Sequence, residues 1–173
     1  MPVAPGRPER SDYEYERRGT ANLSVMVEPL AGWRHIVVTE RRTKQDYARC
    51  LQWLVDVAYP QAKSIRLVQD NLNIHQPSAL YETFPPAEAR RILRKLEIHH
   101  TPMHGSWLTM AEIEISILER GCLSRPVLDV PTLCRKVEAL QAERNAARRT
   151  ICWQFSSARA RVKLQAPYPE VPT

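Results

Sequence analysis

The sequence predicts an α/β (α+β) fold, with a mixed sheet and helices on its faces. Three observations predict it. Apolar residues recur at strand spacing in some segments and at helical spacing in others. The chain has 173 residues, which suits one domain, and 43% of them are apolar, which is enough for a core. Strand-like and helix-like segments also alternate along the chain, as mixed folds require. We expect one domain over 20–166, with an extended lead-in at 1–19 and a tail at 167–173.

The first structured segments predict an antiparallel hairpin. Residues 1–19 are rich in proline and charged residues, and this composition predicts an extended segment. Residues 20–27 are rich in strand-forming side chains, and 34–39 resume that pattern after Pro29 and Gly32. Two such runs around a short break that contains glycine are typical of paired neighbouring strands.

A helix and another strand follow the hairpin. Between residues 43 and 59 the apolar side chains fall three and four positions apart, with Thr43 as a plausible N-cap. Residues 64–70 then form a short strand that ends in an acid, Asp70. The order strand, helix, strand predicts a crossover unit and some parallel pairing.

The rest of the chain is predicted to be mostly helical. Helices are expected at about 86–96, 108–122, 133–149 and 158–164, and a strand at 97–101. The first of these helices carries a basic face that could follow DNA phosphates or could be an ordinary solvated surface: Arg90, Arg91, Arg94 and Lys95.

Composition narrows the function classes. The net charge of +6 and the pI of about 9.4 favour polyanionic partners. No apolar run reaches membrane-spanning length and no signal peptide is evident, so we expect a soluble, cytoplasmic protein with no membrane partner. The cysteines form no CxxC pair, which argues against a zinc framework and a disulfide scaffold: Cys50, Cys122, Cys134 and Cys152.

The strand end at Asp70 is the first candidate site. Polar residues follow the acid directly, at Asn71, Asn73 and His75. Sites in open α/β sheets collect at the carboxyl ends of strands, where a rigid strand holds the side chain. Asp-Asn is also a turn signal, so a plain turn is an equally good interpretation of this segment alone.

Two acids at the start of a predicted helix, Glu112 and Glu114, are the second candidate. Acids in a first turn commonly just complement the helix dipole. A strand-end Asp70 and a helix-borne Glu112 can nevertheless meet at one cleft, although they are 42 positions apart in sequence. Carboxylates are the ligands that Mg²⁺ takes together with substrate phosphates, so the pair is a candidate metal site. A zinc site at His100 and His104 is a weaker alternative, because Pro102 breaks the helical spacing between them.

Several motifs resemble one family. They are Pro-Gly-Arg-Pro-Glu-Arg at 5–10, Tyr13-Glu-Tyr-Glu-Arg with Gly19-Thr-Ala-Asn, Gln69-Asp-Asn-Leu-Asn-Ile-His, Thr101-Pro-Met-His-Gly-Ser-Trp-Leu and Met110-Ala-Glu-Ile-Glu. With them, the stretch from about residue 6 to 169 resembles the DDE endonuclease domain of bacterial insertion-sequence transposases, distant relatives of the mariner elements.

The resemblance implies a ribonuclease H-like fold and two Mg²⁺ ions held by an Asp, Asp, Glu triad. It further implies cleavage of DNA at terminal repeats and transfer to target DNA. Asp70 matches the second acid and Glu112 the third, with Glu114 as the alternative. The cleft would be supported by Asn71, Asn73, His75, His104 and Trp107.

The chain also departs from the family pattern. Thr109 stands where Asn is usual, and Met103 where Lys is usual. The family's first Asp lies on a strand upstream of the motif that here begins at Pro5, so we expect the first strand and its acid to be missing. Asp12, Glu14 or Glu16 could replace that acid only if the charged lead-in held them rigidly.

Three interpretations of the function therefore remain open. The chain is an enzyme-derived fragment that is inactive alone, a non-catalytic protein that binds DNA or full-length transposase and interferes with it, or an inert pseudogene product. Homo-oligomers are a further possible assembly.

Overall fold

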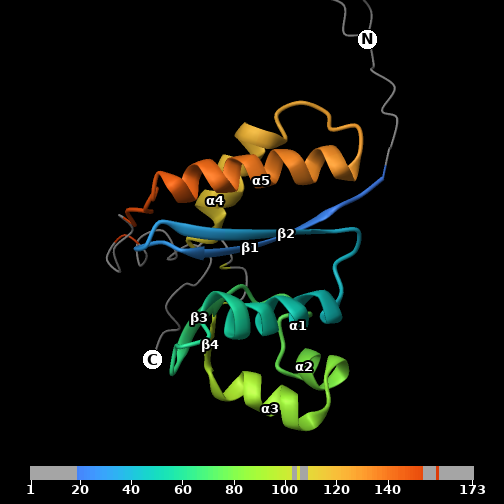
Figure 1. Ribbon diagram of the computed structural model, residues 1–173, viewed down its shortest axis with the longest axis vertical. Coiled ribbons are helices and arrows are strands. Elements are labelled where there is room, and N and C mark those ends of the chain that lie inside the picture. Colours follow the sequence, from blue (N-terminus) through green and yellow to red (C-terminus); the bar gives the residue numbers. More distant parts are fainter. Residues whose placement is uncertain (1–18, 103–104, 106–108, 154–158, 160–173) are drawn as a thin grey trace, which may run out of the picture.

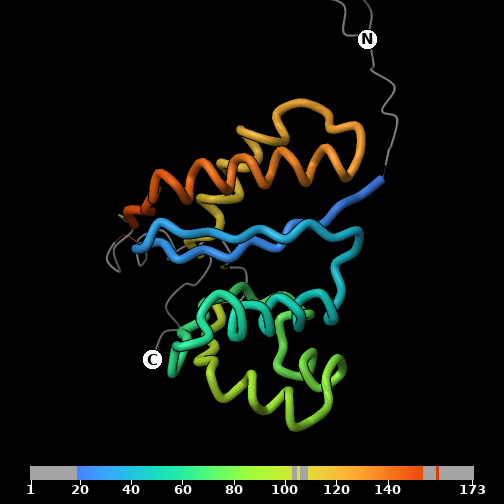
Figure 2. Tube along the Cα trace, in the orientation of Figure 1, coloured from blue at the N-terminus to red at the C-terminus, as the bar shows by residue number. Residues whose placement is uncertain are grey.

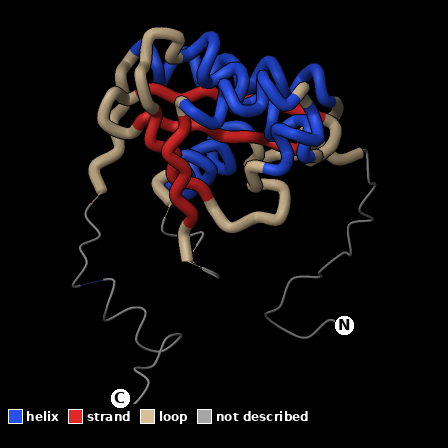
Figure 3. The backbone as a smooth tube through the Cα atoms, turned by 90° about the horizontal axis from the view of Figure 1, so that it is seen from below, coloured by secondary structure: helices blue, strands red, loops and turns tan. Residues whose placement is uncertain are grey.

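The computed structural model describes residues 19–102, 105, 109–153 and 159 of the chain. Figure 1 shows two layers of helices with a strand hairpin between them. Figure 2 traces the path of the chain through these layers. Figure 3 gives the view from below, with both strand pairs in red and the helices in blue around them. This is an α+β fold, compatible with the ribonuclease H-like architecture.

The hairpin consists of β1 (Asn22–Glu28) and β2 (Trp33–Thr39), paired antiparallel from Asn22 opposite Thr39 to Glu28 opposite Trp33. The turn requires glycine. Gly32 has φ of +66°, and a Cβ there would lie 2.5 Å from the backbone carbon of Arg148. The turn is therefore fixed by close approach to the segment that follows the last helix.

One helical layer covers a face of this hairpin. It contains α4 (Ala111–Cys122) and α5 (Val130–Ala146). Ile36 of β2 is buried in a core with side chains from both helices, and the hairpin residues packed against that core are Leu23, Val25 and Val38. Burial of these apolar groups is what holds the hairpin to the helices.

The other layer begins with α1 (Lys44–Trp53), which Thr43 caps through a reciprocal pair of hydrogen bonds with Asp46. A π-helical turn, η1 (Leu54–Ala58), ends it. The crossover from β3 (Ile65–Gln69) to β4 (Leu96–His100) then passes through α2 (Ser78–Thr83) and α3 (Pro86–Arg94). β3 and β4 pair in parallel. The core of this layer is buried between α1, α2 and α3.

Most sequence expectations are confirmed with shifted boundaries. The hairpin, the Thr43 cap and the helices near 86–96, 108–122 and 133–149 are all present. Parallel pairing is present too, but it joins β3 to β4 and not, as expected, β3 to the hairpin across α1. The four cysteines are free. The sequence missed α2, because a six-residue helix is too short to show periodicity. The described strands also form two separate pairs rather than one mixed sheet. The predicted lead-in, apart from Gly19, and the predicted helix at 158–164, apart from Arg159, lie outside the described residues.

Within the described ranges, every helix is too short or too polar to cross a lipid bilayer.

Candidate active site at the end of strand β3

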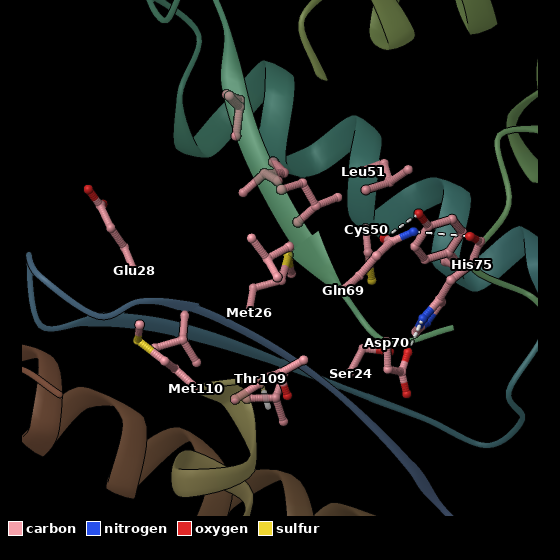
Figure 4. A pocket seen from close by; sticks show the side chains of 18 of the residues that line it. Ser24, Met26, Glu28, Cys50, Leu51, Gln69, Asp70, His75, Thr109 and Met110 are labelled. Carbon is pink, nitrogen blue, oxygen red and sulfur yellow. Dashed lines mark hydrogen bonds and ion pairs between the residues drawn. The ribbon is translucent and has the colours of Figure 1, made fainter. Parts of the chain in front are cut away.

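A cavity of about 930 Å³ lies between the hairpin and the other layer. β1 and β3 line it along their lengths, α1 forms another wall, and the start of α4 closes it. Asp70 and Glu112 both line this cavity. Figure 4 shows Ser24 and Met26 of β1 around the same space as Gln69 and Asp70. The two candidate acids thus line the same cavity, as do Glu28 and Asp46.

Asp70 follows the last residue of β3, so the strand fixes its backbone. Its Oδ1 lies 2.5 Å from Nδ1 of His75, and the dashed line in Figure 4 marks this pair. The Asp70 side chain is 35% exposed and that of His75 is 24% exposed. Each carboxylate has two oxygens, so this contact orients Asp70 while its second oxygen is left for a ligand.

A hydrogen-bond network holds the loop between Asp70 and His75. The buried Tyr47 hydroxyl donates to Gln69 Oε1 at 2.7 Å. The Gln69 amide donates to the His75 carbonyl oxygen at 3.0 Å, and His100 Nε2 lies 2.9 Å from the same oxygen. Burial raises the pKa of Tyr47 to about 12, so its hydroxyl stays a donor at neutral pH.

The Tyr47 ring also supports the site directly. Its centroid lies 4.7 Å from that of His75 at a tilt of 34°. Such offset aromatic contacts limit ring rotation. His75 is therefore fixed by Asp70 at one nitrogen and by Tyr47 at its face.

Glu112 and Glu114 lie in very different surroundings. Glu112 is partly exposed at the cavity, and within the described part of the chain its side chain has no hydrogen-bond or ion-pair partner. Glu114 is 1% exposed, and Arg144 holds both of its oxygens, Nε at 2.7 Å and Nη2 at 3.1 Å. Nε of Arg34 lies 3.1 Å from Oε1, at ion-pair distance although not aligned as a hydrogen bond. Glu114 thus has no oxygen free for a metal, which favours Glu112 of the two.

The other predicted cleft residues separate into three groups. His75 lines the cavity. Asn71 and Asn73 are exposed in the same loop but do not line it, because Leu72 and Ile74 point inward instead. His104 and Trp107 lie outside the described residues.

The predicted basic face of α3 does not reach the cavity. In Figure 1, α3 lies on the far side of α1 from the hairpin. Three of its charges are engaged within the protein, and the first is Arg90, whose Nε donates to the Pro86 carbonyl at 3.3 Å. Arg91 binds Asp56 through both terminal nitrogens, at 2.8 and 2.7 Å, and also binds Glu88. Lys95 Nζ donates to the Pro60 carbonyl at 2.8 Å. Arg94 is exposed and has no such partner among the described residues.

The donor set suits a hard divalent cation but is small. Asp70 and Glu112 offer carboxylate oxygens, and Mg²⁺ keeps several waters when one or two carboxylates bind it. The described residues contain no cluster of three or more side chains able to hold a metal. A two-carboxylate site would therefore depend on water and on phosphate oxygens for its remaining ligands.

Sequence reasoning did not assign Tyr47 or Gln69 to the site, and it offered His100 only as a possible zinc ligand. Tyr47 lies on the apolar face of α1, where its period indicates a core residue. Gln69 could have been identified from the sequence. It is a polar side chain at an inward position of a short apolar strand, and such a side chain needs a buried partner.

The family model for the DDE superfamily endonuclease matches residues 1–134 of the chain. No curated protein and no solved structure matches the chain. The matched stretch includes both candidate acids, β1 to β4 and α4. The chain belongs to the DDE superfamily endonuclease family.

Proposed function

We propose that this domain takes part in the Mg²⁺-dependent cleavage and transfer of DNA strands, with Asp70 and Glu112 as metal ligands. The observation that supports this proposal is that these two acids, from distant parts of the chain, line one cavity. DNA is the substrate class that the family implies. The charge of +6 suits it.

The protein side chains would have distinct roles. Asp70 would offer its second oxygen to the metal, while His75 fixes the carboxylate plane from the other side. Glu112 would offer either oxygen, since no protein group within the described ranges competes for them. A bound pair of ions would activate the attacking oxygen and stabilise the leaving one.

The same arrangement leads us to propose weak metal binding and no cleavage by these residues alone. Two carboxylates compensate little of the repulsion between two divalent cations at short range. The described residues contain no group of three or more side chains that could hold a metal ion, so a further ligand would be required. Non-specific DNA binding with a steep dependence on salt would remain, because it rests on the release of counterions from phosphates.

Mn²⁺ titration of the full 173-residue chain tests the metal site. We expect weak binding, with paramagnetic broadening of amide signals centred on Asp70 and Glu112. Asp70→Asn should abolish the binding and Glu112→Gln should weaken it strongly. Glu119→Gln is the matched control, because Glu119 is an exposed acid on the same helix that does not line the cavity. Equal losses from Glu119→Gln and Asp70→Asn would contradict the assignment.

A cleavage assay tests the need for a further ligand. The chain is incubated with a DNA duplex in Mg²⁺ and then in Mn²⁺, and we expect no product in either. Cleavage that disappears in Asp70→Asn would support the metal site but would contradict the proposal that a further ligand is required.

A further inference from the structure

One arginine at the cavity has no partner for its charge. Among the described residues, the arginines that line the cavity are Arg42 and Arg66. Arg66 is neutralised, because its Nε and Nη2 donate to the Glu97 carboxylate at 3.2 and 3.4 Å. The Arg42 side chain has no hydrogen bond or ion pair within the described part of the chain. Its guanidinium is therefore available to an anionic ligand.

The backbone around Arg42 is held on both sides. On one side, the Thr39 hydroxyl donates to the Arg41 carbonyl oxygen at 2.7 Å. On the other side, Thr43 caps α1, and its amide donates to Asp46 Oδ2 at 3.2 Å. Because the backbone is already ordered, binding through Arg42 costs only the rotamer freedom of its own side chain. The loop between β2 and α1 thus presents this guanidinium from a fixed point.

The start of α1 places Arg42 at the Asp70 end of the cavity. Tyr47 lies in the first turn of α1, and its ring centroid is 4.7 Å from that of His75, which holds Asp70. Arg42 precedes the helix cap by one residue, so its backbone lies on the order of 8 Å from Tyr47 along the helix axis. The Arg42 side chain is exposed and still lines the cavity. Its guanidinium therefore lies at the opening of the cavity on this side.

The other acids of the cavity leave Arg42 free. Figure 4 shows Glu28 on the opposite side of this space from Asp70, and Glu28 accepts a hydrogen bond from Tyr59. Asp46 is used in the helix cap described above. A guanidinium presents its N–H groups as a planar fork that matches two oxygens of one phosphate group. An anion held by Arg42 at the opening would lie on the same side of the cavity as Asp70.

We propose that Arg42 binds a backbone phosphate of the DNA strand that approaches Asp70 and Glu112, through paired hydrogen bonds from its guanidinium. The inference rests on the proposed function, because it takes DNA as the substrate. The contact offsets the repulsion between the Asp70 carboxylate and the phosphate, and it fixes the position of the strand at the cavity opening. A phosphate contact carries no information about base sequence. It also needs no metal, so EDTA is present in every binding test.

Variants of two adjacent arginines test the contact by the salt dependence of binding. The full chain is titrated against a fluorescent random duplex at several salt concentrations. Arg42→Gln should lower the slope of log affinity against log salt by about 0.9 and weaken binding about five- to tenfold at about 0.1 M salt, since one phosphate contact is lost. Arg41→Gln is the matched control, because Arg41 is exposed but does not line the cavity, and its slope should stay unchanged. Equal slopes for the two variants would overturn the proposal.

The guanidinium itself gives a local readout. Arg42→Lys keeps the charge and should keep most of the salt slope, while it removes the Nε–Hε resonance of Arg42 and so identifies that signal by NMR. In the unaltered chain, this signal should shift on addition of the duplex and saturate with the midpoint of the fluorescence titration. The Arg66 signal should move less, because Glu97 already holds its Nε. An Arg42 signal that stays in place while the duplex binds would overturn the assignment.

Failure of this contact and failure of the proposed function give different results. Arg42→Gln should bind Mn²⁺ as the unaltered chain does, because Arg42 supplies no metal ligand. A reduced salt slope in Arg42→Gln, together with Mn²⁺ binding that survives Asp70→Asn, would support the phosphate contact and contradict the metal site. An unchanged slope in Arg42→Gln, with Mn²⁺ binding that Asp70→Asn abolishes, would overturn the contact and leave the metal site supported. An unaltered chain that does not bind the duplex would overturn the phosphate contact and the assignment of DNA as the substrate together.

Discussion

Two carboxylates at the start of α4 lie two residues apart but in opposite environments. Glu112 lines the cavity and has no protein partner among the described residues. Glu114 is almost fully buried between Arg34 and Arg144. Residues two positions apart on a helix point about 200° apart around its axis, so the two side chains face different regions. One acid is available to a ligand, and the other joins elements of the fold.

The buried region is a network that ties three elements together. Arg34 belongs to β2, Glu114 to α4 and Arg144 to α5. Arg34 also donates to the Gly32 carbonyl at 2.9 Å and to the Arg149 carbonyl at 2.5 Å. Burial lowers the pKa of Arg34, and the charge of Glu114 opposes that effect. A buried cation of this kind persists only while its carboxylate partner is present.

Removing the Glu114 carboxylate is expected to have the largest effect on stability. Glu114→Gln leaves Arg34 and Arg144 without a countercharge in the interior, and should lower the free energy of unfolding by about 3–5 kcal/mol. Urea unfolding followed by circular dichroism measures the change.

Glu112→Gln is the matched control, with the same chemical change two residues away. It removes a charge that has no partner among the described residues and should change stability by no more than about 0.5 kcal/mol. Similar losses in the two variants would show that Glu112 also holds the fold.

A contrast between local and distant contacts also explains which parts of the fold could be predicted from the sequence. Local patterns predicted the hairpin and the Thr43 cap, because each depends on neighbouring residues. The pairing of β3 with β4 and the separation of the strands into two pairs depend on contacts across the fold. Periodicity records which face of an element is apolar but not what lies against it.

The site could be predicted only in part for a similar reason. Asp70 is predicted from its residue type and its position at a strand end, and Glu112 from its residue type and from the motif that resembles the family. The choice between Glu112 and Glu114 depends on Arg34 and Arg144, which are 80 and 30 positions from Glu114 and carry no local signal. The support of the Asp70 loop by Tyr47 likewise depends on packing between α1 and the end of β3.

A smaller effect on stability is expected from Tyr47, in the hydrogen-bond network around Asp70. Burial raises the pKa of Tyr47 to about 12, from about 10 in an unfolded chain. The folded state therefore holds this proton more tightly, so the stabilisation is complete below pH 10 and is lost as pH rises toward 12. The loss at this residue should be about 2–3 kcal/mol, and urea midpoints measured from pH 9 to pH 12 record it.

Tyr47→Phe isolates this contribution. The variant should lose about 1 kcal/mol at pH 8, where only the hydrogen bond to Gln69 is missing. Its stability should then fall less steeply above pH 10 than that of the unaltered chain. Tyr81→Phe serves as control, because Tyr81 is 46% exposed. A steep fall that persists in Tyr47→Phe would assign the pH dependence to another group.

The smallest expected effect is on the salt dependence of DNA binding, and it compares a paired arginine of α3 with an unpaired one. Arg91 is held by Asp56 and Glu88, whereas Arg94 is exposed and has no partner within the described ranges. If this face follows DNA phosphates, only a free guanidinium displaces counterions on binding. Arg94→Ala should therefore reduce the slope of log affinity against log salt by about 0.9, since one phosphate contact is lost. Arg91→Ala should leave the slope unchanged although it removes the same formal charge.

Fluorescence anisotropy with a random DNA duplex, from low salt to about 0.2 M, measures both slopes. Equal slopes for Arg94→Ala and the unaltered chain would show that this face is a solvated surface and that DNA binds elsewhere, and the contrast between engaged and free charges would then be confined to α4.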